Sequence, residues 1–340
     1  MFPSPENLVV TGPEGAFANE LVLTFTRQPD KTPAQPVAAM SRAPSGRRDF
    51  PPGSEWLYAK IYCGESTTDR VLREAIAPVA REVIATGDAR QWFFIRYQDP
   101  DPHLRVRFTG EPARLLGTVL PALERAIAPL TAAGAARKLV LDTYARELER
   151  YGGDRGIALV EELFWRDSEA VLGIIELIDG DAGGIARWKL ALRGIDSLFE
   201  ALGLPPEVRA RIAGDAKESL GREMRAETPL WTRIGERFTK ERPDLELLLA
   251  RDPARDAGHD LEPGFELLAA RDALIKPIGD ELRARDAAGE LAPRLEDMAW
   301  SLAHMHANRL LHASQRAQEL VLYDFLRRLH AARKARARGL

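Results

Sequence analysis

The sequence predicts an α+β fold, with a split βαββαβ sheet region of the ferredoxin-like type followed by a mostly helical second half. Two observations support this prediction. Segments with the composition and alternation of strands all lie before about residue 145, and from residue 154 onward nearly every segment has the apolar periodicity of a helix. A doubly wound parallel sheet would instead alternate strands and helices along the whole chain.

The first half supplies the elements of the βαββαβ order. Residues 91–97 (QWFFIRY) and 103–109 (HLRVRFT) predict two strands, and the two prolines of the DPDP segment at 99–102 enforce a tight reversal between them. Residues 66–69 (STTD) supply a helix start. In chain order the predicted elements are strand 56–62, helix 71–84, strand 91–97, strand 103–109, helix 112–130 and strand 138–144.

Glycine and proline divide the second half into helices. The predicted helices cover residues 156–179, 184–202, 206–226, 230–250, 262–286, 294–313 and 316–334. At the other end of the chain, residues 28–53 are rich in Pro, Ser and charge and predict a linker. This linker separates a short N-terminal piece, residues 1–27 with a predicted strand at 20–25, from a main domain expected over residues 54–340.

The composition indicates a globular protein of the cytoplasm. The chain has 340 residues, 45% of them hydrophobic, and a formal net charge of −3, which gives no general attraction for nucleic acid or anionic membranes. A single cysteine, Cys63, excludes an intramolecular disulfide and a cysteine-based zinc site. The N-terminus lacks the basic start and apolar run of a secretory signal, and no segment has the roughly 18–20 uninterrupted apolar residues of a membrane span.

One predicted strand carries arginines on a single face. Because side chains alternate along a strand, His103, Arg105 and Arg107 share one face, and the residues between them (Leu104, Val106 and Phe108) belong to the core. Two arginines about 7 Å apart form a rigid donor array suited to carboxylate or phosphate. The alternative is a solvated sheet face with surface ion pairs.

The segment after the last predicted strand, residues 142–154 (DTYARELERYGGD), is dense in charge. Loops in this position commonly carry function. Gly152 and Gly153 permit unusual backbone angles, and Asp154 is expected to cap the next helix, whose free N–H groups favour an anion nearby. A simple turn followed by a helix cap explains the same residues equally well.

Histidines gather on the helix predicted over residues 294–313. His304, Asn308 and His312 line one helical face at four-residue spacing, whereas His306 is rotated from His304 by about 200°. A metal chelate by His304 and His306 is therefore not expected. A buried histidine bonded to a neighbouring group is the alternative to a catalytic one.

Two further patterns are interpreted as structural. Trp92, Phe93 and Phe94 fall within a predicted strand without a basic cluster beside it, so core packing is expected rather than base stacking. The basic run from Arg327 to Arg338 is interpreted as a solvated helix end, and direct tRNA binding by this chain is not expected.

Several of these segments together resemble the thiopeptide-type bacteriocin biosynthesis domain, the C-terminal domain of lantibiotic dehydratases. The resemblance spans residues 54–329 and is carried by 53–58 (GSEWLY), 92–97 (WFFIRY), 99–105 (DPDPHLR), 150–153 (RYGG) and 304–309 (HMHANR). Residues 3–8 (PSPENL) and 20–23 (ELVL) resemble the end of the preceding glutamylation domain. The chain is thus similar to a split subunit or an excised piece of a longer dehydratase.

The resemblance implies a lyase that eliminates glutamate from glutamylated Ser or Thr of a ribosomally made precursor peptide, giving dehydroalanine or dehydrobutyrine. Such an elimination needs a base near the Cα–H bond, donors for the enolate-like oxygen and cations for the departing glutamate, and it needs neither a metal nor another cofactor. The glutamylation itself is expected from a separate or excised tRNA-dependent domain.

The resemblance also assigns roles to residues of this chain. Arg107 is the surest of the expected catalytic residues, which are Arg107, Arg150, His304 and Glu147. Arg105, His103 and Asn308 are expected to bind substrate. Glu147 is expected to orient an arginine or to transfer a proton, and His304 is preferred to His306 as the acid or base.

Two other functions remain open. Relatives of the same fold in thiopeptide pathways form a six-membered nitrogen ring by a formal [4+2] cycloaddition between two dehydroalanines. A non-catalytic subunit that binds the precursor for a glutamylating partner is the other alternative, with the N-terminal strand adding to the edge of a partner's sheet. A homodimer is compatible with each of these functions.

Overall fold

The computed structural model describes residues 9–13, 15–18, 46–178 and 182–337. The chain divides into two units, Met1–Ala43 and Pro44–Leu340. In the first unit, β1 (Val9–Gly12) and β2 (Gly15–Ala18) pair as an antiparallel hairpin. The strand predicted over residues 20–25 and most of the predicted linker lie outside the described residues. The last residues of that linker belong to the second unit, where Phe50 is buried.

The second unit contains a four-stranded antiparallel sheet in the order β5-β6-β4-β7. Its strands are β4 (Trp56–Tyr62), β5 (Gln91–Gln98), β6 (Pro102–Thr109) and β7 (Lys138–Leu141). Counted along the chain, the first and third of these strands (β4 and β6) are central in the sheet, and the second and fourth (β5 and β7) lie at its edges. This is the arrangement of the split βαββαβ fold. The predicted sheet region is confirmed.

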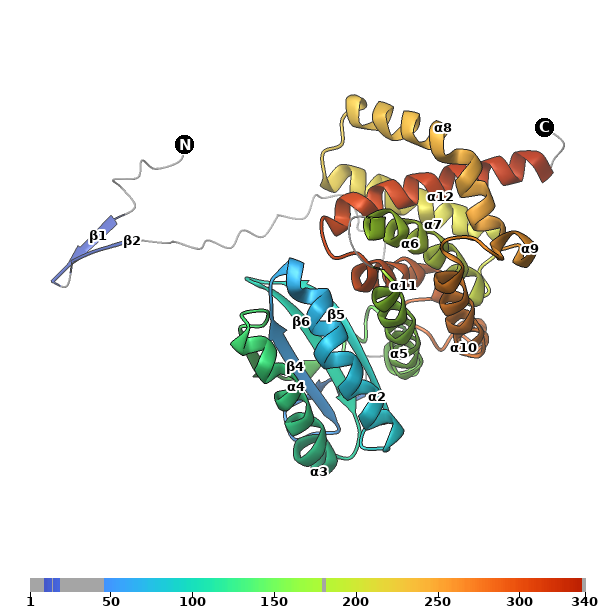
Figure 1. Cartoon of the computed structure of the whole chain (residues 1–340). Coiled ribbons are helices and arrows are strands. Elements are labelled where there is room, and N and C mark those ends of the chain that lie inside the picture. Colours follow the sequence, from blue (N-terminus) through green and yellow to red (C-terminus); the bar gives the residue numbers. More distant parts are fainter. Residues whose placement is uncertain (1–8, 14, 19–45, 179–181, 338–340) are drawn as a thin grey trace, which may run out of the picture. The chain divides into compact units, whose positions relative to one another are not determined.

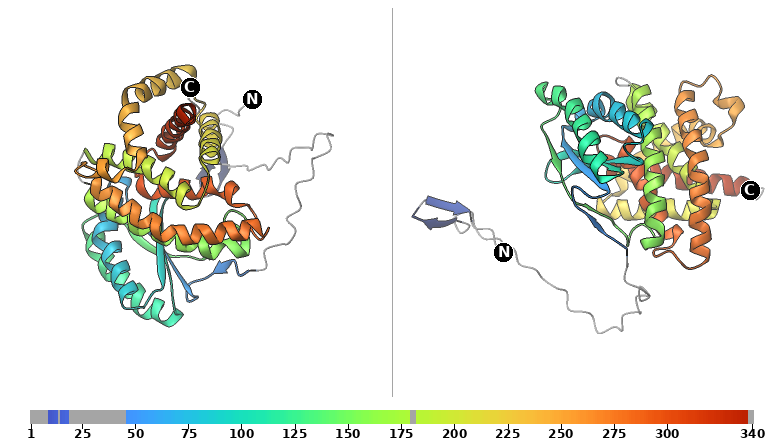
Figure 2. Two further views of the ribbon diagram at one scale, coloured as in Figure 1. Left: turned by 90° about the vertical axis from the view of Figure 1, so that its right-hand side faces the viewer. Right: turned by 90° about the horizontal axis from the view of Figure 1, so that it is seen from below.

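Two helical segments pack against one face of this sheet. The first runs through α1 (Thr68–Val71), the π-helical η3 (Leu72–Ile76) and α2 (Ala77–Ala85), after the short turn η2 (Glu65–Thr67). The second runs through α3 (Pro112–Arg114), the π-helical η4 (Leu115–Val119) and α4 (Leu120–Ala132). Figures 1 and 2 show α2 and α4 side by side over the sheet. This face of β6 consists of the buried Leu104, Val106 and Phe108, as predicted.

One of these segments, Pro112–Ala132, is long and apolar enough to cross a membrane by length and composition alone. Its residues Leu115, Val119, Leu123 and Ile127 are buried and recur at four-residue spacing. A single apolar stripe facing the sheet is the pattern of a core helix. The segment therefore gives only weak support for a membrane span.

The strand predicted over residues 138–144 is interrupted. β7 ends at Leu141, and Tyr144–Ala145 forms a separate strand, β8, which pairs with β3 (Asp49–Phe50). At the break, the Asp142 carboxylate accepts the N–H of Thr143 at 2.7 Å and forms an ion pair with Lys60. Beyond this break the chain leaves the sheet, and Tyr144 lies against Trp56 with ring centroids 5.0 Å apart.

The second half is helical, as predicted, and each predicted helix is present to within a few residues. The long helices are α5 (Gly153–Leu177), α6 (Ala182–Ala201), α7 (Pro206–Glu223), α8 (Thr228–Ala250), α10 (Glu262–Ala287), α11 (Leu295–Leu310) and α12 (Gln315–Ala337), with a short α9 (Pro253–Asp256) between α8 and α10. Pro253 lies at the start of α9, and Asp252 caps it by accepting the N–H of Ala254 at 3.0 Å.

The start of α5 differs from the prediction for Asp154. Gly152 is the N-cap residue, with φ at 80°, and no side chain caps the helix there. Asp154 lies in the first turn, where its carboxylate accepts the N–H of Gly46 at 2.9 Å. A Cβ atom on Gly152 would lie 3.1 Å from the Cα of Gly156, so both the positive φ and the close approach require glycine.

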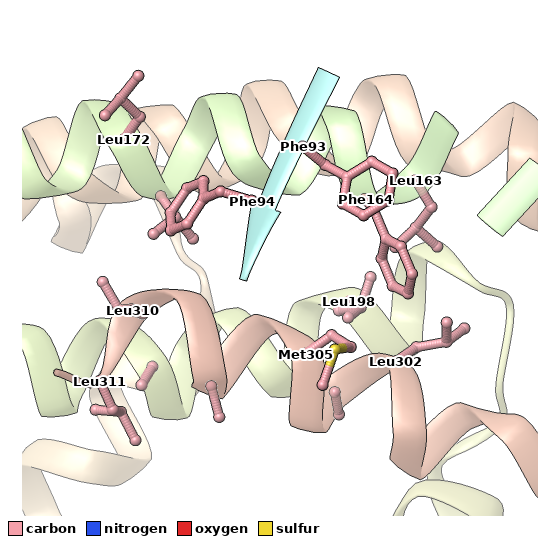
Figure 3. Close-up of a cluster of buried hydrophobic side chains, with 14 of the residues drawn as sticks. Phe93, Phe94, Leu163, Phe164, Leu172, Leu198, Leu302, Met305, Leu310 and Leu311 are labelled. Carbon is pink, nitrogen blue, oxygen red and sulfur yellow. The ribbon is translucent and has the colours of Figure 1, made fainter. Parts of the chain in front are cut away.

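The edge strand β5 is joined to the helices by side chains rather than by another strand. Ser168 of α5 accepts the N–H of Phe94, and Arg309 of α11 donates to the carbonyl of the same residue. Asn308 accepts the N–H of Arg96 and donates to its carbonyl, both at 2.9 Å. Figure 3 shows Phe93 and Phe94 lying between α5 and α11, and both are buried, as predicted, together with Trp92.

A fully buried carboxylate, Asp167 of α5, holds the helices around this junction. One oxygen lies 3.0 Å from Arg271 and 2.7 Å from Nδ1 of His306, and the other lies 2.9 Å from Arg309. Burial alone would raise the pKa of Asp167, but His306, Arg309 and Arg271 outweigh that effect and hold the pKa well below its usual range. The carboxylate is therefore charged in the folded protein at neutral pH.

Replacing Asp167 by Asn should lower the free energy of unfolding by about 3–5 kcal/mol, because the buried Arg309 loses its counter-charge and the buried Arg271 keeps only Asp272. Since the folded pKa is depressed, the stabilisation by Asp167 is complete above its unfolded pKa of about 3.9 and declines as the pH falls below that value. The difference between wild type and D167N in denaturant titrations should therefore shrink below about pH 4.

The matched control is Glu74→Gln, which removes the exposed Arg70–Glu74 pair at 3.0 Å. This change should cost less than about 0.5 kcal/mol, since exposed i,i+4 pairs contribute little. Equal effects of D167N and E74Q would contradict the assigned role of Asp167.

Candidate functional site

A cavity of the second unit has a volume of about 840 Å³ and lies where β5 ends and β6 begins. The segment before α5, the C-terminal half of α11 and the first turn of α12 complete its wall. Residues from all these elements line it, including Arg105, Glu147, Arg150, His304, Asn308 and Arg316. The fold thus brings together residues that lie more than 200 positions apart in the sequence.

Arg105 is held by two neighbours that leave most of its donors free. Its Nε donates to Nε2 of His103 at 3.2 Å, and its guanidinium lies 3.3 Å from the centroid of the Tyr97 ring. His103 Nδ1 lies 2.8 Å from the carbonyl of Asp101, an acceptor, so the proton sits on Nδ1 and Nε2 accepts. The two terminal nitrogens of Arg105 make no hydrogen bond to any described residue, and they are free for an anion.

The environment of His103 keeps its imidazole neutral. Burial is the main cause that lowers the pKa of His103, and the neighbouring Arg105 and Lys60 lower it further. A neutral His103 can accept the hydrogen bond from Nε of Arg105. His103 is therefore a support for Arg105, although its side chain also lines the cavity.

Arg107 is enclosed by aromatic rings. Its guanidinium carbon lies 4.4 Å from the centroid of Tyr58, 4.7 Å from that of Tyr144 and 5.2 Å from that of Phe93. Its side chain makes no hydrogen bond or ion pair with the described residues, and its Nε is a buried donor without a partner. Arg107 does not line this cavity but lies behind Arg105 on the same face of β6. Burial lowers the pKa of Arg107, yet a guanidinium remains charged at neutral pH.

Glu147 and Arg150 lie together at the cavity wall. Nη1 of Arg150 is 3.2 Å from Oε2 of Glu147, and its Nε donates to the hydroxyl of Ser301 on α11 at 3.2 Å. The hydrogen bond ties the loop to α11 and leaves Nη2 of Arg150 unused among the described residues. The prediction that Glu147 orients an arginine agrees with this pairing, while a role in proton transfer stays a prediction.

The two histidines of α11 lie in different surroundings. His304 lines the cavity, and Nδ1 lies 2.9 and 3.1 Å from the two carboxylate oxygens of Glu319 on α12. His306 is fully buried among Asp167 and the arginines, on the opposite side of the helix. The predicted rotation between them is confirmed, and it places His306 in the network that holds the helices together.

Asn308 lines the cavity, but its amide is already engaged. Besides its two bonds to the backbone of Arg96, it donates to Oε1 of Gln315 at 2.9 Å. Its predicted contact with substrate stays a prediction, and the contacts present indicate that it fixes the edge of β5. Within the described residues, no group of three or more His, Cys, Asp or Glu side chains could hold a metal ion.

Glu319 was missed in the sequence. Its signal is positional, because it lies three and four residues before the buried Leu322 and Tyr323 and so falls on the apolar face of its helix. A buried carboxylate on such a face needs a partner, and His304 and the nearby arginines are the candidates. Periodicity alone does not identify which of these residues is the partner.

Residues 56–330 match the family described as lantibiotic biosynthesis dehydratase, C-terminal domain. The chain belongs to this family. The resemblance inferred from the sequence motifs is confirmed, and it places the chain in the biosynthesis of ribosomally made, modified peptides.

Named relatives of the domain support the assignment. The chain is 32% identical over 162 residues to the subtilin biosynthesis protein SpaB of Bacillus subtilis. This matched region is 47% of the present chain and 16% of SpaB. It is 27% identical over 179 residues to the nisin biosynthesis protein NisB of Lactococcus lactis subsp. lactis. This second matched region is 51% of the present chain and 17% of NisB. The matched regions are thus less than a fifth of each relative.

Solved structures share the fold over most of the chain. The tRNA-dependent lantibiotic dehydratase MibB from Microbispora sp. 107891 matches with a TM-score of 0.68 and 25% identity, covering 88% of this chain and 29% of MibB. The pyridine synthase TbtD from thiomuracin biosynthesis matches with a TM-score of 0.63 and 15% identity, covering 82% of this chain and 98% of TbtD. The latter likeness shows the fold alone.

The unpaired charge of Arg107 leads to a prediction about stability. Replacing Arg107 by Met should leave the free energy of unfolding unchanged or raise it by about 1–2 kcal/mol, because the loss of a desolvated charge offsets the lost contacts with the rings. The matched variant is Arg309→Met, which removes an equally buried arginine that is paired with Asp167. R309M should cost about 3–5 kcal/mol, and a comparable loss for R107M in denaturant titrations would contradict this account.

Proposed function

We propose that this domain eliminates glutamate from glutamylated Ser or Thr side chains of a precursor peptide, as a lyase that forms dehydroalanine or dehydrobutyrine. The observation that carries the proposal is that one cavity joins arginines with unused donors to a histidine held by a carboxylate. These are the groups that such an elimination needs: cations for a departing carboxylate and a base for a carbon-bound proton.

The reaction breaks two bonds and forms one double bond. A base removes the proton from Cα of the glutamylated residue, the C–H electron pair forms the Cα=Cβ bond, and the Cβ–O bond breaks to release glutamate as a carboxylate. His304 is the proposed base. Its Nε2 is free of partners among the described residues, while Glu319 occupies Nδ1.

The arginines are proposed to act on the negative charges of the substrate. Arg105 and Arg150 line the cavity with unused terminal donors and can hold the carboxylates of the glutamyl group. Arg107 lies behind them without a counter-ion among the described residues, so it adds positive potential in a region of low dielectric. Glu147 keeps Arg150 in place through the pair at 3.2 Å.

The preceding step requires a partner. The regions matched in SpaB and NisB are small parts of those proteins, and the glutamyl ester is proposed to come from a tRNA-dependent glutamylation domain, separate from or linked to this chain. A cytoplasmic location and a homodimer remain predictions from the sequence.

A pyridine-forming cyclase and a non-catalytic precursor-binding subunit are the competing functions. The fold likeness to TbtD covers nearly all of that enzyme, but at 15% identity it carries no assignment of activity. The three functions differ in their products. Elimination releases glutamate, cyclisation joins two dehydroalanines, and a binding subunit changes no covalent bond.

The decisive experiment uses a synthetic peptide that carries one glutamyl ester on Ser. Wild-type protein should release free glutamate and leave a dehydroalanine peptide, both measured by mass spectrometry. Arg105→Ala and His304→Ala should each slow the release by about 10²–10⁴-fold, the usual contribution of a positioned acid, base or charged donor.

The control is Arg70→Ala, which removes an exposed arginine outside the cavity and should not change the rate. The proposal is contradicted if the wild type releases no glutamate, or if both Arg105→Ala and His304→Ala keep full activity. A cyclised product from a peptide with two dehydroalanines would favour the cyclase instead.

A further inference from the structure

The contact between His304 and Glu319 joins two helices at the cavity wall. Glu319 is fully buried, and its two oxygens straddle Nδ1 of His304 at 2.9 and 3.1 Å. Oε2 of Glu319 also lies 3.3 Å from Nη1 of Arg316, whose Nε donates to Glu223 of α7 at 3.1 Å. The carboxylate is thus held by Arg316 as well as by the histidine.

This geometry selects one tautomer of the imidazole. A carboxylate only accepts hydrogen bonds, so Nδ1 of His304 carries the proton and the lone pair of the neutral ring is on Nε2. The amide nitrogen of Gln315 lies 3.4 Å from the same Nδ1, a longer contact to a weaker partner. The carboxylate decides the tautomer because it is both closer and charged.

The charged groups around His304 come from several elements. Glu319 and Arg316 face it from α12, Glu223 lies behind Arg316 on α7, and Arg105, Glu147 and Arg150 lie across the cavity. Burial is the main cause that raises the pKa of Tyr323 on the same helix well above its usual range, so Tyr323 stays neutral. The buried Glu319 is the carboxylate in contact with the imidazole.

We propose that Glu319 is a positioning residue for the elimination, which fixes His304 as the Nδ1–H tautomer and stabilises the imidazolium formed when Nε2 takes the Cα proton. The proposal rests on the function proposed above. Glu319 accepts no proton itself and touches no substrate. Its contribution is the orientation of the ring and a negative charge placed beside a positive charge that develops during the reaction.

The tautomer can be measured without any turnover. Nitrogen-15 NMR of the histidine side chains distinguishes a protonated Nδ1 from a protonated Nε2, and loss of one signal set in H304Q assigns His304 among the six histidines of the chain. Wild-type protein should show the neutral ring of His304 as the Nδ1–H form. A dominant Nε2–H form would overturn the proposal.

Turnover tests the second half of the proposal. With the glutamylated Ser peptide, Glu319→Gln should lower kcat by about 10²-fold and leave KM nearly unchanged, because the charge beside the imidazolium is lost while the cavity is intact. Glu319→Asp, which keeps the charge on a shorter side chain, should recover part of the loss. Full kcat in E319Q would overturn the proposal, as would an E319D variant no better than E319Q.

The matched control is Glu223→Gln. It removes the other carboxylate on Arg316 without touching His304, and its kcat should equal that of the wild type. A loss equal to that of E319Q would show that anchoring of Arg316, not contact with His304, is responsible, and would overturn the proposal. If the wild type releases no glutamate at all, the proposed function fails, and the tautomer measurement alone decides whether Glu319 positions His304.

Discussion

The placement of the cavity depends on one buried ion cluster around Asp167. This carboxylate binds Arg271 of α10 and both His306 and Arg309 of α11, so three helices meet at a single charge. Arg309 continues from there to the carbonyl of Phe94 on the edge of the sheet. The helical layer is therefore tied to the sheet by directional bonds, which define the rotation of α11 more sharply than apolar packing alone would.

That rotation divides the HMHANR segment between two tasks. His306 and Arg309 point into the helical core, while His304 and Asn308, rotated to the other side, line the cavity. A rotation of this helix by two residues, about 200°, would exchange these sets, placing His306 at the cavity and leaving Asp167 with Arg271 alone. The buried cluster and the exposed site therefore depend on the same register of a single helix.

Much of the fold follows from local patterns, whereas the site depends on long-range contacts. Alternation along 103–109 predicted that Leu104, Val106 and Phe108 belong to the core, and the DPDP segment predicted the reversal before it, because both are properties of neighbouring residues. The burial of His103 and Arg107 on the other face was not predicted. The break of the last strand at Asp142 was not predicted, since it depends on the distant Lys60. The cap expected from Asp154 was wrong for a related reason, as that carboxylate binds Gly46. The pairing of Glu319 with His304 likewise needs the packing of two helices, which periodicity does not supply.

The aromatic enclosure of Arg107 has a consequence for how an anion is received. Tyr58, Phe93 and Tyr144 replace the water shell of the guanidinium, and that replacement is completed when the protein folds. In the proposed reaction, an incoming carboxylate meets a positive field whose source is largely desolvated already and has no side chain to release. An exposed arginine must lose water and change its side-chain position at every binding event. For Arg107, these changes take place once, when the chain folds.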